Sequence, residues 1–522
     1  MSIYILFLTA IAAPITIVLL LFLIPLYQDL SYRFQVWRQR SHVGSPPTFY
    51  SLPFGIPVFT RILKRLLKEK TLMPFFETLW HHRKAATFRQ QVFGQFGIWT
   101  IDPENIKTVL STNFKDYSFG NRNGAFAPLL GDGIFTLDGQ GWKHSRAMLR
   151  PQFTRQQIAQ LDSIERNVTT LISILKESPG QVRDIQALFF QLTIDTATEF
   201  LFGESVQTLS GGNPKIVHAL EFGKAFNAAQ AVLAKRIRLN SFYNALNPRE
   251  FQDWCKTCKS FIESYVQMTL DKQQQNKNKN QDLSQGHSYV FLTELAKETN
   301  DPKVLRDQAL NILLAGRDTT ASLLAWIFYN LAIHPKVFAR LRKEILDQFG
   351  TSPSTLSFES LKQCTYLRYV INETLRLYPL VPVNGRCAIR DTYLPHGGVN
   401  PADPDNYIGS KPVFVPKGTV VGYFVYVLHR DPHYWGADAD EFRPERWAKH
   451  RENAHPWDYL PFNGGPRICL GQQFALTEAG YVTVRLLQEF SEIRGGDTLP
   501  VPPKLESQLT MSVYGGVPVA LV

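Results

Sequence analysis

The sequence has few cysteines and few charged residues. Five cysteines in 522 residues cannot form a disulfide framework, and the odd number leaves at least one thiol free, so we expect a reducing compartment. Only 19% of the residues are charged, whereas 44% are hydrophobic, which excludes a disordered chain and allows a large buried core. The formal net charge of +11 suits an acidic partner, an anionic membrane surface or nucleic acid, and composition alone does not choose among them.

Two nucleotide-binding patterns are absent from the sequence. No Gly-x-Gly-x-x-Gly fingerprint follows a predicted strand, and no phosphate-binding loop occurs. The chain therefore lacks the sequence signature of its own nicotinamide or flavin site. If it catalyses a redox reaction, its electrons must come from another protein.

The N-terminal segment is free of charge. Ile3 to Tyr27 holds no charged side chain and exceeds the roughly 20 apolar residues that a membrane span needs. Ala12 and Ala13 could form a signal-peptide cleavage site, but no positive residue precedes Arg33. We expect residues 1–30 to be a single-span transmembrane anchor. The positive residues that follow it predict a cytosolic catalytic body.

One large domain is expected after the anchor. Residues 31–60 contain several prolines and are predicted to be a proline-rich linker. Residues 91–100 are predicted to form a strand, and helical patterns dominate from about 142 to 350. The polar tract 272–280 is interpreted as a surface linker between two helices. The sequence thus predicts a mainly α domain with small β-sheets over residues 61–522.

The segment FNGGPRICLG carries the strongest chemical signal. Cys469 can supply a thiolate to a haem iron, a ligand that favours O–O bond cleavage. Gly464 and Gly465 allow a tight turn whose amides can donate hydrogen bonds to the sulfur. Arg467 can neutralise a haem propionate, and Gly471 opens a helix whose positive end stabilises the thiolate. Alone, Cys469 would more often be a buried structural thiol.

This segment resembles the haem loop of the cytochrome P450 family. The family pattern Phe-x-x-Gly-x-Arg-x-Cys-x-Gly is matched by Phe462, Gly465, Arg467, Cys469 and Gly471. Other family motifs follow in the family's order, so the resemblance covers nearly all of the chain after the anchor. It implies a cytochrome P450 fold, a heme b cofactor whose iron is ligated by Cys469, and electrons delivered from NADPH by a flavoprotein reductase.

The segment AGRDTT lies in a long predicted helix. Ala315 and Thr319 are four residues apart and share one helix face. Gly316 costs about 1 kcal/mol in a helix interior, so its presence suggests that space is needed there. By resemblance, this space admits dioxygen, Thr319 offers a catalytic hydroxyl and Asp318 relays protons. The alternative is a helix N-cap, or a threonine that bonds back to a carbonyl of its own helix.

Further motifs of the resemblance concern haem placement. Glu373 and Arg376 share a helix face and resemble the family's Glu-x-x-Arg, which forms a buried network with an arginine that corresponds here to Arg446. Trp447 follows, where the family often has Phe. We expect this network to be structural. Propionate contacts are predicted for the residues of a Trp-x-x-x-Arg motif and for a later arginine: Trp142, Arg146 and Arg386.

The resemblance implies insertion of one oxygen atom of O2 into a lipophilic substrate. The implied location is the endoplasmic reticulum membrane, with a reductase and in addition cytochrome b5 as partners and no nucleic acid. Two phrases, PLVPVNGR and GDGIFTLDGQGWKHSRAMLRPQF, resemble fungal enzymes that hydroxylate alkanes and fatty acids at the chain end. By the same resemblance, the mostly apolar segments 119–130, 380–383 and 513–514 line the substrate pocket.

Other functions stay open at this point. Related fungal members act on polyketide, terpenoid or other secondary-metabolite intermediates. A non-oxygenating haem-thiolate isomerase would lack the acid–alcohol pair, whereas Asp318 and Thr319 are present. A haem sensor would need neither this pair nor a surface for a reductase.

Overall fold

The structure, a computed structural model of the whole chain, describes most of its residues. These are 2–39, 42–49, 56–57, 60–61, 64–65, 71–83, 85–92, 95–154, 161–211, 219–278, 290–398, 409, 411–449 and 455–522. They belong to two compact units. The sheet unit comprises Met1–Gly120, Pro382–Ala439 and Ala454–Ile468, and the helical unit comprises Asn121–Val381, Asp440–Asn453 and Cys469–Val522.

The sheet unit contains a six-stranded sheet in the order β1-β2-β3-β9-β6-β4. Its strands are β1 (Thr48–Phe49), β2 (Thr87–Val92), β3 (Gln95–Thr100), β9 (Val420–Tyr423), β6 (Asn384–Ala388) and β4 (Tyr117–Ser118). The strands β2 and β3 pair antiparallel, with the hydroxyl oxygens of Thr87 and Thr100 2.8 Å apart. Alternate side chains such as Ile98 on β3 and Val421 on β9 point into a common apolar core. A separate antiparallel pair consists of β7 (Thr392–Gly398) and β8 (Lys411–Val415).

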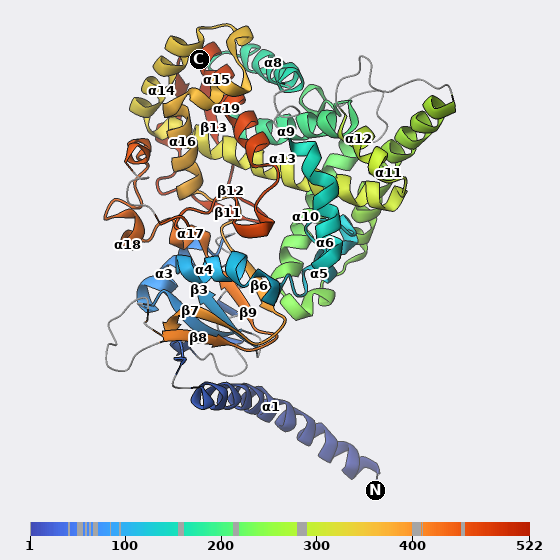
Figure 1. The fold of residues 1–522 in the computed structure, drawn as a ribbon, viewed down its shortest axis with the longest axis vertical. Helices are drawn as coiled ribbons and strands as arrows, with labels where there is room; N and C mark the ends of the chain where they lie inside the picture. The colour runs from blue at the N-terminus through green and yellow to red at the C-terminus, as the bar shows by residue number, and fades with distance from the viewer. Residues whose placement is uncertain are drawn as a thin grey trace. The chain divides into compact units, whose positions relative to one another are not determined.

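Short helices complete the sheet unit, together with the end of the long N-terminal helix. The short helices are α3 (Met73–Arg83), α4 (Pro103–Lys107), α17 (Val425–Leu428) and α18 (Pro432–Trp435). Helix α1 covers Ser2–Arg38 (Figure 1). Near its C-terminal end, Asp29 pairs with Arg89 at 2.6 Å, and the Tyr32 hydroxyl donates to the carbonyl of Phe414 at 3.3 Å. These contacts fix the last turns of α1 to the sheet unit.

The expected membrane anchor, residues 1–30, corresponds to the first part of α1. The side chains of most of its first 21 residues lie outside the described part of the chain. Within the part that is described, no helix combines the length and the apolarity that a membrane span requires. The segment 31–60 was expected to be a linker, but helix α1 continues through Arg38, so the segment begins as a helix. The prolines at 46, 47 and 57 come after the end of this helix.

The helical unit confirms the expectation of a mainly α fold with small sheets. Its helices are α5 (Arg122–Leu130), α6 (Gly139–Leu149), α8 (Asp162–Lys176), α9 (Ile185–Phe202), α10 (Ala219–Arg238), α11 (Arg249–Asn278), α12 (Phe291–Glu298), α13 (Pro302–Ile333), α14 (Pro335–Phe349), α15 (Phe358–Gln363), α16 (Thr365–Leu377) and α19 (Gln472–Glu489). Helix α11 runs through most of the tract 272–280, so the interpretation of that tract as a linker is wrong up to Asn278. Its lysines and glutamines are good helix formers, which explains the difference.

Helix α13 is the central element of the helical unit. It has 32 residues, which corresponds to a length of about 48 Å, and it packs against α9, α11, α16 and α19 (Figure 1). The carboxylate of Asp301 caps its N-terminus by accepting the amide of Lys303, and Pro302 occupies the first turn. Because α13 is surrounded by other helices, its side chains are buried on almost every face, which accounts for its weak apolar periodicity.

Two small sheets belong to the helical unit. The strands β10 (Ile493–Arg494), β13 (Pro518–Leu521) and β5 (Arg183–Asp184) form one, in that order, and β11 (Leu505–Ser507) pairs antiparallel with β12 (Met511–Val513) in the other. The β11–β12 hairpin contacts α13, because the indole nitrogen of Trp326 donates to the carbonyl of Met511 at 3.1 Å.

Candidate active site

The glycine-rich loop before Cys469 forms the tight turn that the sequence predicts. Gly465 has φ = 67°, and a Cβ atom there would lie 1.9 Å from the carbonyl oxygen of Leu110. A Cβ on Gly464 would lie 2.5 Å from the ring of Trp457. Only glycine fits the position of Gly465, and Gly464 lets the backbone approach an aromatic ring. This part of the loop, which also contains Phe462, lies in the sheet unit.

Two predicted propionate ligands meet in the sheet unit. The guanidinium groups of Arg386 and Arg467 lie over the ring of Phe119, at 4.7 Å and 3.9 Å from its centroid. Arg386 is 3% exposed, and its Nη1 donates to the carbonyl of Gly385 and the side-chain oxygen of Asn384. Its buried Nε has no hydrogen-bond partner among the described residues. Such a donor fits an anionic group, so these residues can hold a haem propionate.

Cys469 lies in the helical unit, immediately before α19. Its side chain keeps accessible surface although protein atoms surround it closely. This crowding raises the pKa of the Cys469 thiol, whereas a hydrogen bond from the amide of Gly471 and the charge of Arg146 lower it. Gly471 is also the N-cap of α19, as the motif predicts. The amide and the guanidinium therefore both favour the thiolate.

Trp142 and Arg146 share one face of α6. The Arg146 guanidinium lies 5.9 Å from the Trp142 ring, and Trp142 is buried. Burial lowers the pKa of Arg146, and the negative charge of a Cys469 thiolate would raise it. The structure thus brings Trp142, Arg146 and Cys469 together in the helical unit. Trp142 and Arg146 offer an indole N–H and a guanidinium, which are donors that can bind a carboxylate such as a propionate.

The hydroxyl of Thr319 bonds back to its own helix. It donates to the carbonyl of Ala315 at 2.6 Å, which is the alternative that the sequence left open. At Gly316, an added Cβ would meet nothing within 4 Å. The helix therefore has open space beside Gly316, one turn from the hydroxyl. In this arrangement the hydroxyl must rotate away from Ala315 before it can donate elsewhere.

Asp318 forms a buried ion pair with its neighbour Arg317. The carboxylate and the guanidinium are 2.8 Å apart, and the guanidinium also lies over the ring of Phe190. Burial raises the pKa of Asp318, although the charge of Arg317 and its hydrogen bond oppose the shift. A carboxyl group whose proton affinity is raised in this way suits a proton relay, which is the role that the sequence predicts for it.

A second buried acid escaped the sequence analysis. Glu478 on α19 is 1% exposed, and it accepts the hydroxyl of Thr196 at 2.6 Å. Burial raises its pKa to about 7, and the hydrogen bond from the Thr196 hydroxyl partly opposes this shift. The only sequence signal was a single acidic residue in the apolar stretch FALTEAGYV, nine positions after Cys469.

Glu373 is the centre of the predicted structural network. Its side chain is fully buried and accepts five hydrogen bonds, at 2.8–3.0 Å. The donors are Nε and Nη2 of Arg376, the amide of Arg443, Nε of Arg446 and the indole Nε1 of Trp447. Arg376 also donates to the carbonyl of Glu441 at 3.0 Å. Trp447 therefore extends the network, because a phenylalanine there could donate no hydrogen bond.

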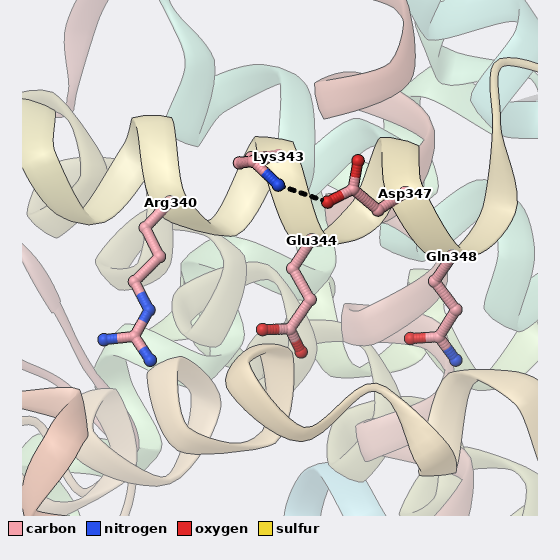
Figure 2. A pocket seen from close by; sticks show the side chains of 5 residues that line it. All are labelled: Arg340, Lys343, Glu344, Asp347 and Gln348. Atoms are coloured by element: carbon pink, nitrogen blue, oxygen red, sulfur yellow. Dashed lines mark hydrogen bonds and ion pairs between the residues drawn. The ribbon is translucent and has the colours of Figure 1, made fainter.

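A separate polar pocket of about 420 Å³ lies along α14. Figure 2 shows the side chains that line it: Arg340, Lys343, Glu344, Asp347 and Gln348. Lys343 and Asp347 form an ion pair at 2.6 Å, drawn as the dashed line. The pocket contains none of the predicted site residues, and its charged lining does not suit a lipophilic substrate.

Comparisons with known proteins point to one family. The cytochrome P450 family model matches residues 52–513. The chain is 47% identical over 489 residues to cytochrome P450 52A13 of Debaryomyces hansenii, covering 92% of each chain. It is 49% identical over 451 residues to cytochrome P450 52A5 of Candida maltosa, covering 84% of this chain and 83% of the relative. The crystal structure of a cytochrome P450DA heme domain superposes with a TM-score of 0.71, covering 92% of this chain and 97% of the chain in that structure. The two sequences are 20% identical, so this likeness shows a shared fold.

Proposed function

Because the chain belongs to the cytochrome P450 family, we propose that it hydroxylates the terminal carbon of a fatty acid or an alkane. Family membership itself fixes the reaction class. The chain is a cytochrome P450 monooxygenase that uses haem with a cysteine thiolate on the iron, and its electrons come from NADPH through a reductase. It consumes O2 and acts on a lipophilic substrate.

We assign the thiolate ligand to Cys469. The observation that carries this assignment is the environment of the sulfur: the Gly471 amide bonds to it, Arg146 lies near it, and α19 begins three residues later. All three stabilise a negative charge on the sulfur. The haem, when bound, would supply the oxidising chemistry. In this proposal Trp142 and Arg146 are propionate ligands of the helical unit, and Arg386 and Arg467 are propionate ligands of the sheet unit.

Proton supply is assigned to α13. Asp318 holds a proton more readily than an ordinary carboxyl group, because its side chain is buried. Thr319 lies one residue further along the same helix and provides a hydroxyl near the open space at Gly316. In this proposal Asp318 receives protons from solvent, and the Thr319 hydroxyl positions them. Glu373, Arg376 and Arg446 hold the fold around the site and take no part in the chemistry.

The substrate class is supported by the sequence and by the relatives. Two phrases of the chain, around Trp142 and around Arg386, resemble fungal enzymes that hydroxylate alkanes and fatty acids at the chain end. The relatives named above come from Debaryomyces hansenii and Candida maltosa, and each is a member of the 52A group. Oxidation of a polyketide or terpenoid intermediate is the alternative, and substrate screening separates the two.

A membrane location completes the proposal. Residues 1–30 would cross the endoplasmic reticulum membrane once, leaving the catalytic domain in the cytosol with the reductase and cytochrome b5. Large apolar side chains on the later part of α1 are exposed, among them Leu23, Leu26, Leu30, Phe34 and Trp37. Such residues suit contact with lipid, and Trp37 suits the interface between lipid and water.

The test uses the full-length protein in membranes with a reductase and NADPH. Dodecane, dodecanoic acid and a terpenoid are supplied, and the products are identified by mass spectrometry. We expect a hydroxyl group on the terminal carbon of the first two. If only the terpenoid is oxidised, the terminal hydroxylation proposed here is wrong, and oxidation of a secondary-metabolite intermediate replaces it.

The ligand assignment is tested with Cys469→Ser and with Cys387→Ser as its control. Cys387 is a partly exposed cysteine on β6 whose sulfur lies 3.9 Å from the carbonyl oxygen of Ala388. We expect the reduced, carbonyl-bound spectrum typical of thiolate ligation to disappear in Cys469→Ser and to persist in the control. A normal thiolate spectrum in Cys469→Ser would refute the assignment.

A further inference from the structure

A group of buried polar side chains lies on α13, ahead of Ala315. Its members are Asp307, Gln308 and Asn311, each at most 2% exposed. They span little more than one helical turn, so their side chains lie close together along one side of the helix. Each forms a hydrogen bond with the segment 130–145, which runs from the end of α5 into α6. We refer to these three residues as the polar seam.

Two members of the polar seam hold the loop that leads into α6. The Asp307 carboxylate accepts the amide of Asp132 at 2.9 Å, and the Asn311 side-chain oxygen accepts the amide of Phe135 at 3.2 Å. A Cβ on Gly133 would lie 2.3 Å from Nδ2 of Asn311, so glycine lets the loop lie directly on this side chain. The loop that precedes α6 is therefore fixed to α13.

The third member, Gln308, fixes α6 itself. Its Nε2 donates to the hydroxyl of Ser145 at 2.6 Å, and both side chains are buried. Ser145 directly precedes Arg146 and lies one turn after Trp142, so it belongs to the turn that carries these two predicted propionate ligands. The apolar contacts of α6 with the core of the helical unit have no preferred direction, whereas a hydrogen bond fixes a distance and an angle. This bond therefore sets the position of that turn.

Stability alone does not account for a glutamine at this position. The buried Oε1 of Gln308 has no hydrogen-bond partner among the described residues, and the side chains at 309–310 and 312–314 are all apolar. An unpaired buried oxygen destabilises a fold, whereas apolar side chains of similar shape in place of Gln308 and Ser145 would avoid that cost. What the glutamine supplies, and an apolar side chain cannot, is the directional contact with α6.

The turn of α6 that Gln308 holds lies beside the proposed iron ligand. Arg146 is close enough to Cys469 for the charge of each group to act on the other. On α13, Asn311 is followed by Ala315 and Thr319 at intervals of four residues, so the three share one face of the helix. The polar seam thus connects the helix of the proposed proton supply with the helix of the propionate ligands.

We propose that Gln308 is a positioning residue for the haem. By holding Ser145, it fixes the turn of α6 that carries Trp142 and Arg146, and the guanidinium of Arg146 thereby stays beside the sulfur of Cys469. Gln308 itself would touch neither the haem nor the substrate. The inference rests on the proposed function, because it takes Cys469 as the iron ligand and the two α6 residues as propionate ligands.

The experiment removes each end of the hydrogen bond and then both ends together. Full-length haem-loaded protein is prepared as wild type, Gln308→Met, Ser145→Ala and the double variant; methionine is similar in size to glutamine but donates no hydrogen bond. The control Gln488→Met removes another buried glutamine, near the C-terminal end of α19, whose Nε2 donates to the carbonyl of Gly350 at 2.9 Å. The reduction potential of the haem, the rate of haem transfer to apomyoglobin and the free energy of unfolding are measured.

In Gln308→Met we expect haem transfer to be about 2- to 10-fold faster, as for the loss of one hydrogen bond. The reduction potential should be lower, because a guanidinium held less closely to the sulfur gives less stabilisation to the reduced centre, which is more negative. Ser145→Ala and the double variant should show the same changes, since all three lack the same bond. The free energy of unfolding of the double variant should stay near that of the wild type, and the control should keep the wild-type potential and transfer rate.

A reduction potential that is unchanged or higher in Gln308→Met, with haem transfer at the wild-type rate, would overturn the proposal, because any remaining effect on unfolding would then be structural. Additive effects in the double variant would overturn it as well, because they would show separate causes. A wild-type protein without the carbonyl-bound spectrum of thiolate ligation would instead refute the proposed function. That spectrum is recorded first, so the two failures are distinguished.

Discussion

The substitution Glu373→Gln tests whether the network around Glu373 stabilises the helical unit. The native carboxylate is fully buried and accepts five hydrogen bonds, from Arg376, Arg443, Arg446 and Trp447. Glutamine has nearly the same shape but no charge, and its amide group faces guanidinium donors. The change therefore removes the counter-charge without creating a cavity.

The magnitude follows from the burial of the two arginines. Arg376 is fully buried and Arg446 is 9% exposed, so neither guanidinium can regain a full hydration shell when Glu373 is neutralised. Removing one partner of a buried ion pair costs about 3–5 kcal/mol. Because folded domains are stable by only about 5–15 kcal/mol, we expect a large loss of folded protein and of bound haem.

The assay measures the free energy of unfolding in denaturant and the carbonyl-binding haem per mole of protein. The matched control is Glu294→Gln, which breaks a surface pair with Lys297 at 2.7 Å where both side chains are at least one third exposed. This control should cost about 0.5 kcal/mol or less. If Glu373→Gln unfolds with a free energy close to that of the control and retains normal haem content, the network does not have the stabilising role argued here.

Two further predictions concern the helical unit. Thr319→Val should raise the hydrogen peroxide released per NADPH consumed, whereas Thr319→Ser should keep the wild-type ratio because it retains the hydroxyl; equal ratios in both variants would contradict the assigned role. Glu478 keeps its proton up to about pH 7 in the folded state, whereas the carboxyl group of the unfolded chain ionises near pH 4.5. The free energy of unfolding should therefore fall by about 3 kcal/mol as the pH rises from 4.5 to 7, and it should change no further above pH 7. Glu478→Gln should abolish this pH dependence of the free energy of unfolding, measured between about pH 4.5 and 7.5. If the pH dependence persists in the variant, another group is responsible for it.

Local sterics explain which features could be predicted from the sequence. The turn at Gly465 and the helix start at Gly471 depend on residues within a few positions, so the motif predicts both. The role of Trp447 depends on Glu373, 74 residues away, and the sequence showed only that it differs from the usual family residue. The hydroxyl partner of Glu478, Thr196, is 282 residues away. Long-range partners of this kind are fixed by packing, which no local pattern contains.

Asp318 and Glu478 are among the carboxyl groups of the helical unit whose pKa is raised, and their partners differ. Asp318 pairs with Arg317, which favours the ionised form, whereas Glu478 accepts a hydrogen bond from a neutral hydroxyl, that of Thr196. Burial thus raises the pKa of both groups, and a cation opposes the shift only at Asp318. The Thr319 hydroxyl can donate to another acceptor only after leaving Ala315, which costs about 1 kcal/mol for one hydrogen bond. Gly316 has no side chain to hinder this rotation, so in the proposed proton delivery the Thr319 hydroxyl moves while the helix backbone stays in place.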